Sequence, residues 1–396
     1  MDNEKYIVQG FKASAVAAGL KKVEALDLAL IVSEREAAVA GVFTTNKVRA
    51  APVLLSERHV KNGKARAIIA NAGNANACTG SPGLNDARTT ADLVGKALGM
   101  SAEEVLVAST GVIGQRLNMG VVARAIPLLT EALSPDALPL VAKAIMTTDS
   151  FPKISSFEGQ AGGRPYRIMG IAKGAGMIMP HMATMLCFIL SDISIDPDTL
   201  KRALLSSVRS TFNRITVDGD TSTNDMVLVM ANGLAGNGVL SAGEYDIFAG
   251  GLRDVMGDLA RMIVRDGEGA TKLVSVDIKN AFSSSDALKA ARTVANSSLV
   301  KTAFYGQDPN WGRIVAALGR AEIEMIEERV DIWIDEVQIV AGGLGRGAEA
   351  EKRAAEIMTR KEFTLTIDLH QGAYHDRMVT CDLTHEYVTI NADYRT

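Results

Sequence analysis

The sequence has few aromatic residues, no excess of positive charge and only three cysteines. Phe, Trp and Tyr make up 5% of the 396 residues, and the net charge at pH 7 is −4. Nucleic-acid binding favours a basic surface and aromatic side chains that stack on bases. This composition therefore argues against nucleic acid as a partner.

The cysteines Cys78, Cys187 and Cys381 are odd in number and far apart in the chain. Their spacing matches neither a disulfide framework nor a metal site, which is typical of a reducing compartment. No segment approaches the roughly 18 consecutive apolar residues of a membrane-spanning helix, and the first residues lack the basic and then apolar pattern of a signal peptide. We expect a cytoplasmic protein without membrane contact.

The sequence does contain an unusual stretch near its middle, residues 173–186, which reads KGAGMIMPHMATML. Gly174 and Gly176 make its first part flexible, and Pro180 restricts the backbone that follows. The apolar run from residue 185 to residue 190 is typical of a buried strand. Thr184 is therefore expected at the entrance of a core strand, behind a segment that can bend.

That position suits a cut in the main chain between Ala183 and Thr184. If Thr184 Oγ attacks the Ala183 carbonyl carbon, the amide becomes an ester that water hydrolyses, and the new chain begins with threonine. A threonine hydroxyl needs an adjacent base, and a free α-amine, with a pKa of about 7.7–8.0, can serve as that base. From residue types alone, a glycine loop that enters a strand through a turn-capping threonine is the commoner arrangement.

The same stretch resembles the processing site of the ornithine acetyltransferase family, the glutamate N-acetyltransferases of arginine biosynthesis. The family pattern is close to KGSGMIxPNMATML, and this sequence departs from it at Ala175 and His181, where serine and asparagine are usual. Neither departure touches the junction between Ala183 and Thr184. His181 is either a base for self-cleavage or a solvated loop residue. Further family motifs occur on both sides of this stretch, in the order typical of the family, from residue 41 to the last residue.

A second motif, STGVIG at residues 109–114, follows a short apolar run at 105–108. A strand that ends in Thr-Gly ahead of a helix leaves backbone N–H groups unpaired at the helix start, and such groups can hold an oxyanion. From the residues alone, an ordinary capped turn is the better explanation. The resemblance assigns the oxyanion hole to Thr110 and Gly111.

The resemblance also assigns substrate contacts to Thr147, Lys173, Thr184, Glu268, Asn391 and Thr396. Taken alone, Lys173 is a single cation among small residues, which suits a carboxylate. Glu268 is a carboxylate between two glycines, which suits an ammonium group. Both residues are equally explained as solvated surface charges.

Two further motifs are weaker signals. The run from Asp218 to Asp225 resembles a calcium loop, but Val229 stands where an EF-hand needs glutamate, so we expect no metal. Residues 343–348, GLGRGA, approximate the dinucleotide-binding pattern G-x-G-x-x-G/A, but no clear βαβ repeat surrounds them.

The resemblance implies a mixed α/β fold, an α-β-β-α sandwich of the self-processing ornithine acetyltransferase and aminopeptidase type, plus a smaller C-terminal α/β domain. Cleavage would give an α chain of residues 1–183 and a β chain of residues 184–396. Residues 184–279 would complete the catalytic domain, and residues 280–396 would form the C-terminal domain. The two chains are expected to associate as a heterotetramer of two α and two β chains.

Apolar periodicity predicts separate strands at 26–32 and 38–43 and a single strand at 330–340. It also predicts that the strands at 363–369 and 378–383 pair with each other. The chain end is expected to be frayed.

The implied reaction moves the acetyl group of N2-acetyl-L-ornithine to L-glutamate through an acetyl ester on Thr184, without a cofactor. The residues do not tell whether acetyl-CoA is a second acetyl donor. Two alternatives stay open. One is a self-cleaving aminopeptidase or amidase, in which water takes the acyl group. The other is an uncleaved ligand-binding protein that holds a phosphate at the loop around Gly345.

Overall fold

The computed structural model describes residues 4–21, 25–179 and 185–393. Its helices are α1 (Ala51–Val60), α2 (Gly80–Leu98), α3 (Met119–Glu131), α4 (Leu138–Ala144), α5 (Pro197–Ser210), α6 (Ala242–Arg265), α7 (Ser284–Ala295), α8 (Ser298–Tyr305), α9 (Trp311–Gly319), α10 (Ala348–Met358) and α11 (His385–Asp393). Short 3-10 helices are η1 (Glu4–Tyr6), η2 (Ala102–Glu104), η3 (Phe212–Arg214) and η4 (Glu327–Arg329).

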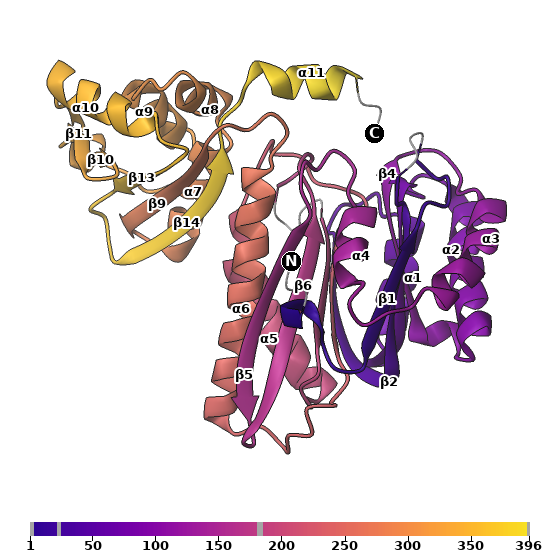
Figure 1. Cartoon of the computed structure of the whole chain (residues 1–396). Coiled ribbons are helices and arrows are strands. Elements are labelled where there is room, and N and C mark those ends of the chain that lie inside the picture. Colours follow the sequence, from indigo (N-terminus) through magenta and orange to yellow (C-terminus); the bar gives the residue numbers. More distant parts are fainter. Residues whose placement is uncertain (1–3, 22–24, 180–184, 394–396) are drawn as a thin grey trace. The chain divides into compact units, whose positions relative to one another are not determined.

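The strands of the first sheet are β1 (Phe11–Val16), β2 (Leu28–Phe43), β3 (Lys64–Asn74), β4 (Val105–Val112), β5 (Lys153–Ala161), β6 (Arg164–Lys173), β7 (Leu186–Ser191) and β8 (Met226–Ala231). Those of the second sheet are β9 (Leu273–Ala281), β10 (Asp331–Ile334), β11 (Val337–Ala341), β12 (Leu344–Gly345), β13 (Glu362–Asp368) and β14 (Tyr374–Cys381). Figure 1 labels many of these strands and helices and colours them along the chain.

Residue contacts divide the chain into two units, each built around one of these sheets. The first unit comprises Met1–Asn213 and Asp220–Ile263, and the second comprises Arg214–Gly219 and Val264–Arg395. In the first unit the strand order is β4-β3-β2-β8-β7-β6-β5, and β1 also pairs with β2. Two neighbouring pairs, β3 with β4 and β7 with β8, are parallel, and the other pairs are antiparallel.

The long strand β2 joins two halves of the first sheet. Its first part lies between β1 and β3, and its last part, from Ala38 to Phe43, pairs with β8. Between them the pairing with β3 shifts register after Val32, as at a β-bulge, which bends a strand. The strands predicted at 26–32 and 38–43 are therefore one continuous strand.

Both halves of this sheet contribute to one hydrophobic core. Ile68 and Leu106 from the first half share it with Ile171 and Phe188 from the second half. The neighbouring residue Ile69 belongs to a different core, because successive strand residues point to opposite faces. That second core packs the first half of the sheet against α1, α2 and α3.

On the second half, α6 packs closely against β6. A Cβ atom on Gly170 would lie 2.7 Å from Val255 and 2.8 Å from Leu259, so the helix lies directly on the glycine. Helix α5 contacts β2. The resulting order of helices, two sheet halves and helices confirms the mixed α/β sandwich.

The second unit corrects several expectations from the sequence. Its strand order is β12-β11-β10-β13-β9-β14, so the strands predicted at 363–369 and 378–383 flank β9 instead of pairing with each other. The strand predicted at 330–340 is the hairpin of β10 and β11, which turns at Asp335 with a positive φ of 47°. The frayed end predicted for the chain is helix α11 up to Asp393.

Besides Arg214–Gly219, the second unit contains the residues from Val264 onward and therefore includes β9, the strand between β13 and β14. The domain boundary at residue 280 stays a prediction. The division of the chain at residue 183 stays a prediction. Within the described residues, no helix is long and apolar enough to cross a membrane. The same residues contain no group of three or more His, Cys, Asp or Glu side chains arranged to hold a metal ion.

Candidate active site

The site residues predicted from the sequence fall into three sets. Those in the first unit are Thr110, Gly111, Thr147 and Lys173, and those in the second unit are Glu268 and Asn391. Ala183, Thr184 and Thr396, together with His181, lie outside the described residues.

Lys173 brings three predicted residues of the first unit together. It is the last residue of β6, and its side chain is buried with 5% exposed. Its Nζ donates hydrogen bonds to Thr147 Oγ1 at 2.8 Å and to Thr110 Oγ1 at 3.5 Å. Thr147 follows α4 and Thr110 lies in β4, so three segments that are far apart in the sequence meet at one ammonium group.

A buried carboxylate, that of Asp149, fixes this arrangement. Asp149 Oδ1 accepts hydrogen bonds from Lys153 Nζ and from the Gly174 N–H, both at 2.7 Å. Asp149 Oδ2 accepts the Thr147 N–H at 3.0 Å and lies 3.8 Å from Lys173 Nζ. The side chains of Asp149 and Lys153 are fully buried. One carboxylate therefore anchors both partners of the Lys173–Thr147 hydrogen bond.

The charges around Asp149 explain its ionisation. Burial alone would raise the pKa of Asp149, but the nearby ammonium groups of Lys173 and Lys153 outweigh burial and hold it below its ordinary value. Burial lowers the pKa of a third lysine, Lys21, although the nearby negative charges of Asp27 and Asp149 oppose this shift. Lys21 Nζ donates to the Leu26 and Ala144 carbonyl oxygens at 2.7 and 3.2 Å.

Sequence reasoning missed Asp149, Lys153 and Lys21. The Thr-Thr-Asp run at residues 147–149 follows an expected helix, and from sequence alone it is read only as a polar helix end. The sequence signal for the role of Asp149 is Lys153, four residues later. Lys153 is the first residue of β5, and its ammonium group is buried against the Asp149 carboxylate. A lysine in that position is buried only when it is paired.

Thr110 and Gly111 lie within β4, and the next α-helix, α3, begins only at Met119. The expectation that they stand at a helix start is therefore wrong. Gly111 has a positive φ of 127°, and a Cβ atom there would lie 2.4 Å from the Gly73 carbonyl carbon. Only glycine can bring β4 this close to the neighbouring strand β3, in which Gly73 is the partner of Gly111.

In the second unit, Glu268 and Asn391 contact each other. Asn391 Nδ2 donates to Glu268 Oε2 at 2.8 Å and to the Tyr387 carbonyl oxygen at 2.9 Å. The contact depends on α11, because Asn391 lies on that helix. Two residues that the sequence resemblance assigned to substrate are thus neighbours.

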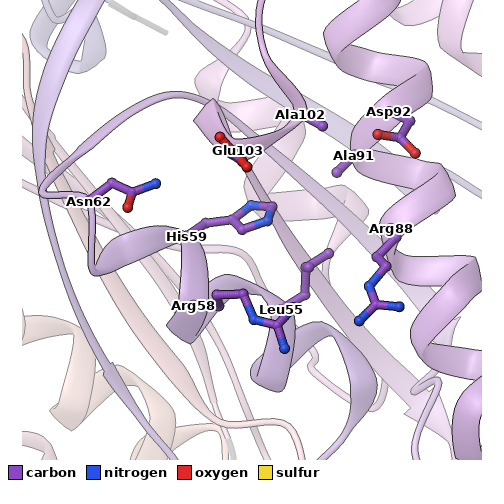
Figure 2. Close-up of a pocket in the computed structure, with 9 residues that line it drawn as sticks. All are labelled: Leu55, Arg58, His59, Asn62, Arg88, Ala91, Asp92, Ala102 and Glu103. Carbon is purple, nitrogen blue, oxygen red and sulfur yellow. The ribbon is translucent and has the colours of Figure 1, made fainter.

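Two other features do not contribute to this site. A pocket of about 350 Å³ beside α1 and α2, shown in Figure 2, is lined by Arg58, His59 and Arg88 among others, but by none of the predicted site residues. The glycine motif at residues 343–348 contains the two-residue strand β12, which pairs antiparallel with β11, and its Gly345 packs closely on Trp311. The glycine turn of a dinucleotide site instead follows a strand of a parallel βαβ unit.

The first unit therefore presents a buried lysine and two threonine hydroxyls at the end of β6, in a mixed α/β sandwich. This arrangement defines a site that offers hydrogen-bond donors to a negatively charged oxygen. Chain comparison then identifies the protein family: residues 12–396 match the ArgJ family, and the chain belongs to it.

Two curated relatives cover almost the whole chain. The arginine biosynthesis bifunctional protein ArgJ of Geobacter sulfurreducens is 53% identical over 98% of this chain and 100% of that protein. The glutamate N-acetyltransferase of Methanocaldococcus jannaschii is 46% identical over 98% of this chain and 97% of that protein.

A crystal structure of the arginine biosynthesis bifunctional protein ArgJ from Bacillus halodurans is also similar, with 42% identity and a TM-score of 0.50. The match covers 52% of this chain and 98% of the solved chain. That solved chain is therefore about half as long as this one.

We predict that Asp149→Asn destabilises the protein by about 3–5 kcal/mol at pH 7, because it leaves the buried Lys153 ammonium without its counter-charge. The folded pKa of Asp149 lies below its unfolded value. Its ionised form therefore stabilises the protein above about pH 4, and this contribution is lost as the pH falls further. The difference in unfolding free energy between wild type and variant, measured with denaturant from pH 7 to pH 3, should shrink below about pH 4.

Asp192→Asn is the matched control. Burial raises the pKa of Asp192, which accepts the Arg167 N–H at 2.8 Å. The ionised form of Asp192 therefore destabilises the folded protein, and protonation removes this effect. The unfolding free energy of wild type should rise relative to that of Asp192→Asn as the pH falls. A wild-type-to-Asp149→Asn difference that does not change with pH would contradict the assigned charge on Asp149.

We also predict that Gly111→Ala destabilises the protein more than Gly114→Ala does. Both glycines have positive φ, 127° and 82°, but a Cβ atom on Gly114 meets open space, whereas one on Gly111 meets the Gly73 and Asn74 backbone. Gly114→Ala should cost about 1–2 kcal/mol from backbone strain, and Gly111→Ala about 1–3 kcal/mol more from overpacking. Equal unfolding midpoints for the two variants in a denaturant titration would show that the strands are not held this closely.

Proposed function

We propose that this protein transfers the acetyl group of N2-acetyl-L-ornithine to L-glutamate, through an acetyl ester on Thr184, in arginine biosynthesis. Membership of the ArgJ family and the relative named glutamate N-acetyltransferase support this reaction. The observation that carries it is the buried Lys173 ammonium, which bonds to Thr147 and Thr110 at the end of the strand that leads to the KGAGMIMPHMAT segment.

The proposal begins with cleavage of the chain. Thr184 Oγ attacks the Ala183 carbonyl carbon, the ester C–O bond forms as the C–N bond breaks, and the hydroxyl proton passes to the freed α-amine of Thr184. Water then hydrolyses the ester, which releases the Ala183 carboxylate and restores the Thr184 hydroxyl. The half-length chain of the Bacillus halodurans relative supports a division of the family's chain into two pieces. The fragments 1–183 and 184–396 then stay together, and we propose a heterotetramer of two copies of each.

In the transfer step the Thr184 α-amine takes the hydroxyl proton while Oγ attacks the acetyl carbon. The Thr110 hydroxyl and the Gly111 N–H stabilise the oxyanion, and removal of one such donor typically costs about 10²–10³ in rate. The C–N bond breaks, and ornithine leaves with the proton on its amine. The glutamate amine then attacks the acetyl ester by the reverse sequence and restores the Thr184 hydroxyl.

Both substrates carry carboxylate groups, and acetylornithine also carries an ammonium group. In this proposal Lys173 and Glu268 supply the complementary charges, with Thr147, Asn391 and Thr396 as further contacts. The reaction needs no metal or cofactor, because the nucleophile, its base and the oxyanion donors all belong to the chain. The Geobacter sulfurreducens relative is named bifunctional; for a second activity of this chain we propose acetyl-CoA as the acetyl donor. The cysteine pattern supports a cytoplasmic location.

We predict parallel lines in double-reciprocal plots when N-acetylornithine is varied at several fixed glutamate concentrations, because the acetyl-enzyme forms before glutamate reacts. Intersecting lines would contradict an acetyl-enzyme. As a control, ornithine release should stop after one turnover when glutamate is omitted. Continued release into water would instead favour a self-cleaving amidase.

A further inference from the structure

The segment from Ser222 to Asp225, directly before β8, contacts two parts of the first unit that the proposed chemistry uses. Its last two residues are buried, with 6% of Asn224 and 1% of Asp225 exposed. The resemblance of residues 216–225 to a family motif implies that this stretch packs beside the active site, but it assigns neither residue a role of its own.

Asp225 fixes the start of the strand that follows Thr184. Asp225 Oδ1 accepts the Met185 N–H at 2.9 Å, and the Met226 N–H donates to the Met185 carbonyl oxygen at 3.0 Å. Met185 is therefore held at both of its backbone polar groups. Its nitrogen is the atom to which the Thr184 carbonyl carbon is covalently bonded, so the nucleophile's own peptide bond begins at this anchor.

Asn224 fixes the end of the strand that carries the oxyanion residues. Asn224 Nδ2 donates to the Ser109 carbonyl oxygen at 2.8 Å and to the Ala75 carbonyl oxygen at 2.7 Å. Asn224 Oδ1 accepts from Thr223 Oγ1 at 2.6 Å, which fixes the orientation of the amide. The Ser109 carbonyl carbon is bonded to the Thr110 nitrogen, so this contact acts one peptide bond before Thr110.

The sheet alone does not connect these two places directly. Strands β4 and β7 are separated in the strand order by β3, β2 and β8. Asn224 and Asp225 are consecutive residues, whose Cα atoms lie about 3.8 Å apart across a trans peptide bond. One dipeptide therefore spans, through its side chains, a separation that otherwise depends on three intervening strands.

We infer that Asn224 and Asp225 are positioning residues: they set the spacing between Met185, the residue that follows Thr184 in the chain, and the Ser109–Thr110 peptide that leads to the oxyanion donors. The inference rests on the proposed function, since it needs Thr184 to be the nucleophile. Burial raises the pKa of Asp225 well above its ordinary value, although the Met185 N–H and the Lys173 charge oppose this. A neutral acceptor of the Met185 N–H is consistent with a positioning role.

The first test compares Asn224→Ala with a matched control, Asn237→Ala. Asn237 is also buried, and its Nδ2 also donates to two carbonyl oxygens, those of Ser194 and Gly238, both at 2.9 Å. Asn224→Ala should lower kcat for acetyl transfer roughly 10²-fold, with KM unchanged, because misplacement of reacting groups by about 1 Å has that effect. Asn237→Ala should lose a similar amount of thermal stability and keep its kcat.

The extent of self-cleavage, read from intact mass, is the second readout. A folded Asn224→Ala chain that stays uncleaved, beside a cleaved Asn237→Ala chain, supports the inference in the same way as the loss of kcat. Equal kcat and equal cleavage in the two variants overturn it. Wild-type protein that neither cleaves nor transfers acetyl groups refutes the proposed function instead.

The Asp225 variants decide the matter if Asn224→Ala does not fold. Asp225→Asn keeps an oxygen that accepts the Met185 N–H, whereas Asp225→Ala removes it. The asparagine variant should recover most of the cleavage and kcat that the alanine variant loses. A folded Asp225→Asn protein as impaired as Asp225→Ala overturns the positioning role, because the carboxyl group would then act by other means.

Discussion

The buried carboxylate of Asp149 is the interaction on which the candidate site depends. It neutralises Lys153, accepts the N–H groups of Thr147 and Gly174, and lies beside Lys173. A lysine enclosed in the interior is stable only with such a partner. The carboxylate thus allows a positive charge to remain buried next to threonine hydroxyls, which makes their hydrogen bonds stronger than in water.

The rest of the first unit supplies rigid positions for this charge. Lys173 ends β6, Thr110 lies near the end of β4, and Met185 precedes β7. Each is a buried residue of a strand or directly precedes one, and sites on strands are held more precisely than sites on loops. The Asn224–Asp225 dipeptide adds a side-chain link between β4 and the start of β7. The distance between these two strands therefore depends on rigid parts of the unit.

Part of this framework is visible in the sequence. The continuous apolar run at 185–190 predicts the buried strand β7, and the family motifs mark Thr110, Thr147 and Lys173. The sequence did not predict the partner of Asp149, because that pairing depends on the return of the chain in β5. It also mispaired the strands at 363–369 and 378–383, because β9 lies between them only in the folded sheet. Pairing of distant strands and charges is a tertiary property that local periodicity does not encode.

The most direct test of the account is the intact mass of wild-type protein and of Thr184→Ala after each is mixed with N-acetyl-L-ornithine in the absence of glutamate. The account predicts two wild-type fragments, residues 1–183 and 184–396, with one acetyl group on the second fragment that disappears when glutamate is added. The variant should remain one unacetylated chain. An uncleaved wild type, or a cleaved enzyme that transfers acetyl groups without ever carrying one, would contradict the account.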